Sequence, residues 1–247
     1  MIFIRLLAVH TYYTCLELFR QPMYIVSTIL FPSMFFWFFG IPNAKEPGAI
    51  SMLMASFSCF GVMSVVLFQF SVGISQEKDS TWYYYIRSLP YPRGLLLTSR
   101  LFSGLLFSML SIGGVIATAI VLGNLPVADV SWCDFLIRIY LGAIPFALMG
   151  ICLGLMVGSR SVLPVANLIY LPMSFAGGLW MPPDILPKLV QDISPYLPSR
   201  MYGEMMWASV LNGTVEAKYV WGLVIYSIIF LVLAVFLYRK EEERSFR

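Results

Sequence analysis

The sequence from Ala49 to Ser75 reads AISMLMASFSCFGVMSVVLFQFSVGIS, and none of these residues is charged. About 20 predominantly apolar residues are enough for a helix to cross the hydrocarbon core of a bilayer, which is ~30 Å thick. A soluble protein of this size would need a polar coat around such a segment. The stretch therefore predicts a transmembrane helix and places the chain among the all-α integral membrane proteins.

The composition of the whole chain agrees with a membrane protein. Of its 247 residues, 59% are hydrophobic and 12% are charged, whereas soluble domains carry roughly 25% charged residues. The four cysteines lie far apart without a CxxC pair, which indicates small apolar residues rather than a disulfide or metal framework. The net charge of +3 is small, and no nucleic-acid partner is expected.

Hydropathy divides residues 1–247 into one transmembrane domain with six predicted spans. The six segments are residues 22–40, 49–75, 94–122, 135–158, 161–180 and 219–238. Lys and Arg gather in cytoplasmic segments of membrane proteins, and here eleven of the sixteen fall on one side of the predicted spans. We therefore expect a multi-pass protein of the inner (plasma) membrane with both termini in the cytoplasm.

The stretch before the first span, in which we predict a helix over residues 3–20, has polar residues at helical spacing, His10, Thr14, Glu17 and Gln21. Apolar residues fall on the other side of the same helix. This pattern predicts an amphipathic helix that lies in the membrane interface and ends before Pro22.

Only mildly polar side chains occur in the middle of the predicted spans, and the candidates that could line a translocation route are Gln69, Ser71, Asn167 and Ser174. Two interpretations stay open: hydrogen bonding between helices, or a polar lining. Ion-coupled carriers usually have ionisable residues inside the membrane, so that class is disfavoured. No catalytic or metal-binding motif occurs, and no phosphate-binding loop. If ATP drives this protein, another chain must bind it.

Between the second and third spans, residues 77–93 read EKDSTWYYYIRSLPYPR. Ser75 or Gln76 followed by Glu77 and Asp79 is typical of a helix start, and Pro90 limits the helix. The sequence predicts a short cytoplasmic helix over residues 77–88. It could be an aromatic anchor at the lipid headgroups, or a docking helix for a cytoplasmic partner, since aromatic residues dominate binding at such interfaces.

Residues 181–218 connect the fifth and sixth spans on the outer side, and they are too apolar for a free loop. Short apolar-faced helices are expected on both sides of Pro195 and Pro198. We predict that this segment returns into the outer leaflet as a re-entrant helical hairpin. The alternative is a plain surface lid.

These features together resemble the type-2 ABC-transporter permease family. The resemblance rests on the interfacial helix, six spans, E-K-x-S at Glu77–Ser80, and G-G-L-W-M-P-P followed by L-P and I-S-P-Y-L-P after the fifth span. It covers essentially the whole chain. The aromatic residues after Ser80 depart from the usual pattern of that family, which is richer in Thr or Leu.

The resemblance implies a membrane subunit of an ABC exporter. Such a subunit pairs with a second copy or a paralogue, and ATP and Mg²⁺ are bound by a separate cytoplasmic ATPase subunit. The residues implied to couple to the ATPase are Glu77, Lys78, Asp79, Trp82, Tyr83 and Arg87. The residues implied to cap the route on the outer side are Gly177, Gly178, Pro182, Pro183, Pro195 and Pro198.

The substrate is expected to be an amphipathic drug, antibiotic, peptide or lipid, because the spans are apolar. This subunit itself is not expected to be an enzyme, nor to bind a cofactor. The alternatives are an ATP-independent channel or carrier, and a membrane scaffold.

Overall fold

The computed structural model describes residues 2–44, 48–80, 94–125, 130–181, 186–211 and 213–245, and these residues form helices and connections without any strand. The helices are α1 (Ile2–Phe19), α2 (Pro22–Ile25), η1 (Val26–Leu30), α3 (Phe31–Phe35), η2 (Phe36–Gly40), α4 (Ile41–Asn43), α5 (Ala49–Lys78), α7 (Gly94–Gly123), α8 (Trp132–Met156), α9 (Val162–Ala176), α10 (Lys188–Ile193), η5 (Ser194–Tyr196), α11 (Pro198–Val210) and α12 (Ala217–Ser245).

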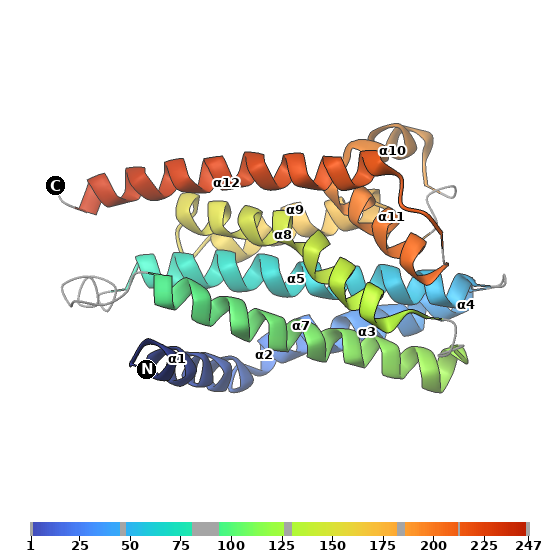
Figure 1. The fold of residues 1–247 in the computed structure, drawn as a ribbon, viewed down its shortest axis with the longest axis horizontal. Coiled ribbons are helices and arrows are strands. Elements are labelled where there is room, and N and C mark those ends of the chain that lie inside the picture. Colours follow the sequence, from blue (N-terminus) through green and yellow to red (C-terminus); the bar gives the residue numbers. More distant parts are fainter. Residues whose placement is uncertain are drawn as a thin grey trace.

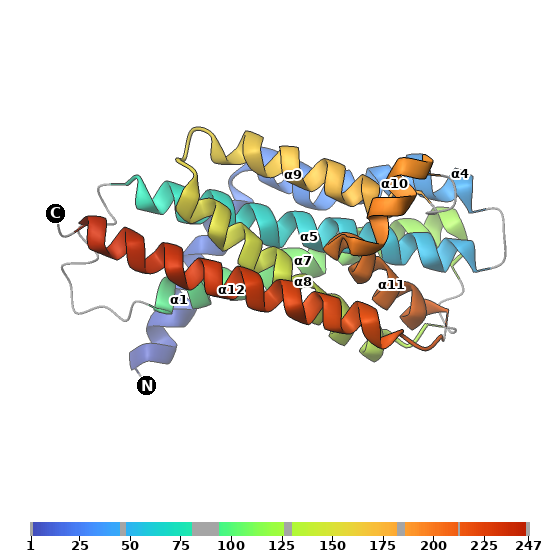
Figure 2. The same cartoon turned by 90° about the horizontal axis from the view of Figure 1, so that it is seen from above.

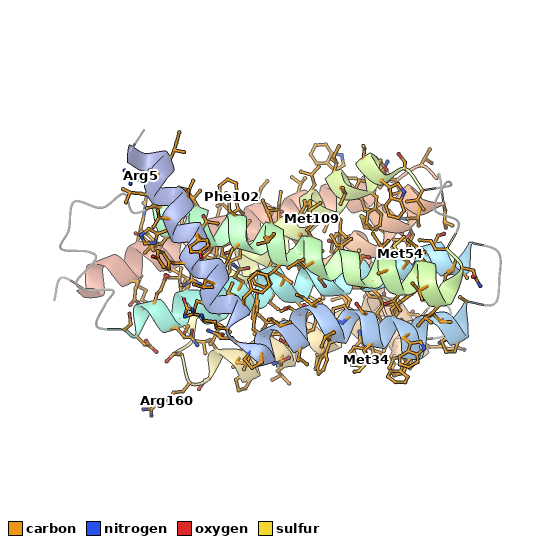
Figure 3. The ribbon with its side chains drawn as sticks, turned by 90° about the horizontal axis from the view of Figure 1, so that it is seen from below. Arg5, Met34, Met54, Phe102, Met109 and Arg160 are labelled. Carbon is orange, nitrogen blue, oxygen red and sulfur yellow. The ribbon has the colours of Figure 1, made fainter. Side chains whose placement is uncertain are left out.

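The long helices run side by side, with α5 in the centre and α7, α8, α9 and α11 in contact with it (Figure 1). Helix α1 and the last residues of α5 and α12 lie at one end of the bundle, which we call the α1 end. The opposite end, with α4 and α11, is the α11 end. Helix α1 runs obliquely across the long helices (Figure 2). The two arginines labelled at the α1 end, Arg5 and Arg160, belong to the group that the sequence predicts to be cytoplasmic (Figure 3).

The first predicted span is a continuous helix with two π-helical stretches, η1 and η2. Each π stretch ends one residue before an X-Pro bond, at Phe31-Pro32 and at Ile41-Pro42. A proline ring clashes with the carbonyl four residues earlier, and a widened turn relieves the clash. The Phe31 N–H donates to Val26 O and the Ile41 N–H to Phe36 O, which are the i−5 bonds of a π turn.

Helix α5 is buried along nearly its whole length, from Ser51 to Ser75. Its closest neighbour is α8, because glycines on α8 leave room for the α5 backbone. A Cβ atom added to Gly150 would lie 2.8 Å from Leu67 O, and one added to Gly154 would lie 2.8 Å from Ser71 O. Small residues of this kind allow membrane helices to approach closely.

Among the residues that the structure describes, five helices are long and apolar enough to cross a membrane, while α9, in the fifth predicted span, falls short of that length. Its 15 residues extend about 22 Å, less than the ~30 Å hydrocarbon core. Gly178 ends the helix with a left-handed φ of +75°. The Gly178 N–H donates to Phe175 O and the Leu179 N–H to Ser174 O, which is a Schellman motif. The fifth span, and with it the count of six, therefore stays a prediction.

Helix α11 lies inside the bundle at the α11 end and packs against α5, α8 and α12. Tyr202 is fully buried and its hydroxyl donates to Ile139 O over 2.7 Å. The Trp207 indole N–H donates to the Ser56 hydroxyl over 2.7 Å. The second helix predicted within residues 181–218 is thus confirmed as a helix, while its depth in a membrane stays a prediction.

A first prediction follows from the contact between α5 and α8. We expect Gly154→Ala to destabilise the protein by about 1–3 kcal/mol, because the added methyl group overpacks the α5 backbone. The measurement is thermal unfolding of the purified protein in detergent. Gly113→Ala is the matched control, since a Cβ at Gly113 meets nothing within 4 Å. Equal melting temperatures for the two variants would contradict the prediction.

Candidate functional site

The last turn of α5 carries three consecutive charged residues, Glu77, Lys78 and Asp79, at the α1 end. Helix α5 continues through Lys78, and Asp79 caps it. Glu77 and Lys78 therefore end a long helix, whereas the sequence predicts that they begin a separate one. The other predicted coupling residues, Trp82, Tyr83 and Arg87, lie outside the described residues.

Glu77 binds Arg100 on α7. Glu77 Oε1 and Arg100 Nη2 are 2.5 Å apart, and the two side chains are 32% and 14% exposed. Arg100 also donates to two carbonyl oxygens of α5, Gln69 O at 3.3 Å and Gly73 O at 3.1 Å. A buried guanidinium needs such partners, because desolvating an uncompensated charge costs several kcal/mol.

Lys78 and Asp79 reach in another direction, to the end of α8 and the turn that follows it. The Lys78 ammonium donates to Leu155 O over 2.9 Å. The Ser159 backbone N–H donates to Asp79 Oδ2 over 2.8 Å. This hydrogen bond, together with one from the Ser159 side chain, holds the pKa of Asp79 below its ordinary value. The Ser75 hydroxyl adds a bond to Val157 O.

The four candidate lining residues do not lie on one polar surface. Gln69 is 3% exposed and its amide donates to Arg100 O and to the Ser103 hydroxyl on α7. Ser71 is fully buried. Asn167 donates to Leu163 O within its own helix, α9. Ser174 donates to Leu171 O and accepts the indole N–H of Trp180. Gln69 thus links α5 to α7, and the two α9 residues serve local contacts.

The predicted outer cap is described in part. Gly177 and Gly178 end α9, and the space of the missing Gly177 side chain is taken by Ser199, whose hydroxyl donates to Met173 O. Pro198 is buried at the start of α11, and Pro195 is exposed in η5. Pro182 and Pro183 lie outside the described residues.

An aromatic cluster at the junction of the first span, α5 and α9 was not predicted from the sequence. Trp180 lies at its centre, with ring centroids 5.2 Å from Phe35, 5.6 Å from Phe60 and 6.2 Å from Phe39. Tyr170 stacks on Phe60 at 4.9 Å. Offset and edge-to-face aromatic pairs add packing energy beyond their buried area. The cluster therefore holds the end of α9 against the first span and α5.

Arg100 is the functional candidate that the sequence reasoning missed, since it entered only as one positive charge among eleven. A signal was available: Arg100 lies inside α7, one of the apolar helices long enough to cross a membrane. An ionisable residue at such a position usually has a specific partner.

At the α11 end, a cavity of about 330 Å³ is lined by Arg200, Glu204, Trp207 and Tyr219, among other residues. Arg200 and Glu204 form an ion pair at 2.6 Å, and the Arg200 guanidinium lies 5.0 Å from the Trp207 ring centroid. Among the described residues, no group of three His, Cys, Asp or Glu side chains could hold a metal ion.

The long apolar helices are those of a membrane protein, and comparison with known proteins identifies the family. The family model for the ABC-2 type transporter matches residues 5–211. The chain belongs to this family. It is also similar to the Bacillus subtilis (strain 168) protein named "Putative transport permease YvfS", with 25% identity over 227 residues that cover 90% of this chain and 93% of that protein. The chain is therefore a multi-pass membrane transport subunit of the ABC-2 type.

A second prediction concerns the pH dependence of the Asp79 contact. Because the bond from Ser159 favours the ionised carboxylate, its stabilising contribution is present at neutral pH. This contribution is present above the ordinary Asp pKa of about 3.9. It is lost as the pH falls from there through the lowered pKa of Asp79, where the carboxylate becomes protonated. We expect Asp79→Ala to lower the melting temperature at pH 7, and the difference from wild type to shrink below about pH 4.

The measurement is thermal unfolding in detergent between pH 7 and pH 3. Asp79→Asn removes the titrating group but keeps its size, so it separates loss of charge from loss of volume. A difference from wild type that stays constant over the whole range would contradict the prediction.

Proposed function

We propose that this chain is the membrane half of an ATP-driven exporter. It pairs with a second copy or a paralogue, and a separate ABC-type ATPase subunit binds and hydrolyses ATP with Mg²⁺ in the cytoplasm. Membership of the ABC-2 type transporter family supports this assignment.

The observation that carries the proposal is the construction of the α1 end. Helix α5 ends there in charged residues that are braced to neighbouring helices. The aromatic-rich residues 81–93 follow directly and lead into α7. A segment fixed at its base in this way is suited to receive a force from a cytoplasmic partner. In this proposal Trp82, Tyr83 and Arg87 contact the ATPase, while Glu77, Lys78 and Asp79 anchor the coupling segment.

The translocation route is proposed to run between paired subunits along α5 and α9. Gln69, Ser71, Asn167 and Ser174 would be exposed to it in at least one state of the transport cycle. The outer side is proposed to be closed by the segment from Gly177 to Pro198. The largely apolar spans suit an amphipathic cargo such as a drug, antibiotic, peptide or lipid.

A third prediction tests the ATPase partnership. The full chain, co-expressed with a candidate ABC-type ATPase of the same organism, is expected to co-purify with that ATPase in detergent at a stoichiometric ratio. Trp82→Ala combined with Tyr83→Ala should reduce the ATPase recovered at least about tenfold, because truncating aromatic anchors at an interface costs about 2 kcal/mol or more.

Trp221→Ala is the matched control, since Trp221 is 65% exposed on α12 at the α11 end. This variant should retain the ATPase. A wild-type chain that purifies without any ATPase would contradict the proposal and favour a channel, a carrier or a scaffold.

A fourth prediction tests the orientation in the membrane. The proposed topology places the α11 end outside the cell. Cys133, at the start of α8, is exposed, whereas Cys59 and Cys152 are buried. A membrane-impermeant maleimide added to intact cells should therefore label the wild type, and Cys133→Ser should abolish this labelling. If Cys133 is labelled only after the membrane is permeabilised, the α11 end faces the cytoplasm and the proposed orientation is wrong.

A further inference from the structure

The cavity at the α11 end is lined by parts of three helices and by the connection between α11 and α12. Its lining residues on α11 and at the end of that helix are spaced so that they share one face, and they are Arg200, Glu204, Trp207, Ala208 and Leu211. Met52 of α5, residues 213–216 of the connection and Tyr219 of α12 complete the lining (Figure 1). The volume of about 330 Å³ falls within the range of small-ligand sites, so a compact polar group fits inside.

The cavity carries charges of both signs on its α11 wall. Arg200 and Glu204 are 17% and 24% exposed, and the Nε and Nη2 atoms of Arg200 both donate to Glu204 Oε1, over 2.9 Å and 2.6 Å. Glu204 Oε2 and Arg200 Nη1 make no such bond to any other residue that the structure describes. The ion pair therefore offers one further acceptor and one further donor to a ligand.

Neighbouring contacts hold the walls of this cavity in a fixed shape. The Trp207 indole N–H donates to the Ser56 hydroxyl, and the Arg200 guanidinium packs 5.0 Å from the centroid of the Trp207 ring. In the connection, the Gly213 N–H donates to Ala208 O over 2.9 Å and the Tyr219 N–H donates to Glu216 O over 3.0 Å. A site that exists before its ligand arrives loses less entropy when the ligand binds.

The charges of the cavity favour a zwitterionic ligand. A ligand with a single charge would meet one like charge of the Arg200–Glu204 pair, and like charges side by side oppose binding. A zwitterion places its anionic group on Arg200, whose planar fork matches a phosphate, and its cationic group on Glu204.

The aromatic residue of the cavity narrows the choice of cation. A quaternary ammonium binds through open aromatic faces, but the Trp207 ring already packs against the Arg200 guanidinium. A primary ammonium instead donates hydrogen bonds to a carboxylate oxygen, and Glu204 Oε2 is placed to accept one. The chemistry of the walls thus fits a phosphate and a primary ammonium in one molecule.

The surroundings of the cavity indicate that this molecule is a lipid. Leu211 and Val215 add apolar surface to the lining, and on α12 the residues directly after Tyr219, Val220 and Trp221, are exposed and apolar. Helix α12 is long and apolar enough to cross a membrane, and Tyr and Trp are enriched where such helices meet water. The cavity therefore lies at the depth of the lipid headgroups, next to a surface that suits acyl chains.

We propose that this cavity binds the headgroup of phosphatidylethanolamine, with the phosphate on Arg200, the ammonium on Glu204 and the acyl chains along α12. The inference goes beyond the proposed function, because it requires no ATPase and holds whichever side of the membrane the α11 end faces. Within the described part of the chain, no residue of α9 and none of the four candidate lining residues of the translocation route borders the cavity.

The experiment measures lipid binding to the full chain, purified and delipidated in detergent. Native mass spectrometry gives the apparent dissociation constant for each of three lipids with the same acyl chains: phosphatidylethanolamine, phosphatidylglycerol and phosphatidylcholine. We expect phosphatidylethanolamine to bind at least about tenfold more tightly than either of the others, because each lacks the hydrogen bonds from a primary ammonium to a carboxylate. Soluble phosphoethanolamine, which has the headgroup without the chains, should bind more weakly than the lipid.

Three variants separate the charges of the cavity from its shape. Glu204→Gln keeps the size of the side chain and should remove the preference for phosphatidylethanolamine over phosphatidylglycerol, a change that a purely structural role of Glu204 would not produce. Arg200→Gln should weaken phosphatidylethanolamine at least about tenfold. Leu211→Trp fills the cavity without touching the ion pair, and it should weaken the same lipid even if the charge variants fail to fold. Lys188→Ala is the control, since Lys188 is exposed on α10 at the same end and lies outside the cavity.

Each outcome decides for or against the site. Equal affinities for the three lipids would overturn the inference, and so would a Glu204→Gln or a Leu211→Trp variant that binds phosphatidylethanolamine as the wild type does. If phosphoethanolamine binds as tightly as the lipid, the lipid assignment is wrong and the cavity takes a soluble zwitterion. Selective binding that is lost in the cavity variants and kept in Lys188→Ala would establish the site, whether or not an ATPase partner is found.

Discussion

The close contact between α5 and α8 is the constraint on which the rest of the structure depends. In a bilayer, helices gain no hydrophobic energy by leaving lipid for one another, because lipid tails are as apolar as leucine. Van der Waals packing and hydrogen bonds must hold them together, and both require short distances. Gly150 and Gly154 provide these distances on α8. Helix α5 can then be buried on all sides, and α7, α9 and α11 are arranged around it.

The two ends of the bundle are closed by different chemistry. At the α1 end, charged side chains of α5 bind backbone and side-chain groups of α7 and α8. At the α11 end, the aromatic groups of Tyr202 and Trp207 on α11 donate single hydrogen bonds into the core. The outer surface of the helices between these ends is apolar, as Phe102 and Met109 show on α7 (Figure 3). Polar contacts thus hold both ends of the bundle, while packing and single hydrogen bonds, such as that from Tyr170 on α9 to Phe60 O on α5, hold the helices along their length.

The long helices could be predicted from the sequence because hydropathy averages over many residues and depends little on neighbours. The rotation of each helix about its own axis could not be predicted. A helix that is apolar all round has no sequence pattern that shows which side packs against its neighbours. Gln69 illustrates the difference: its place in the second span was predicted, but its contact with Arg100 needed the position of α7. Helix α5 also continues past the predicted end of the second span, residue 75, through Lys78. The sequence did not indicate this, because the partners of Glu77 and Lys78 lie on other helices.

The glycine pair after the fifth span was visible in the sequence, yet the length of α9 was overestimated. The apolar residues Leu179 and Trp180 continue the hydropathy signal past Gly178, where the backbone turns left-handed and the helix stops. The predicted docking surface around Trp82 and Tyr83 lies outside the described residues, so its residues stay a prediction. Glu77, Lys78 and Asp79, just before this segment, make tertiary contacts that no local sequence pattern predicts.

The π-helical stretches of the first span have a consequence for the evolution of the chain. A π turn accommodates one residue more than the α-helical turn it replaces, and π bulges are found frequently at functional sites. Deleting one residue from Val26–Leu30 or from Phe36–Gly40 would restore α geometry and compensate the register locally. In α5 the same deletion would rotate every later residue by about 100° and turn buried side chains toward new neighbours. Among homologous chains, single-residue gaps should therefore be tolerated at these two places in the first span and be absent from α5.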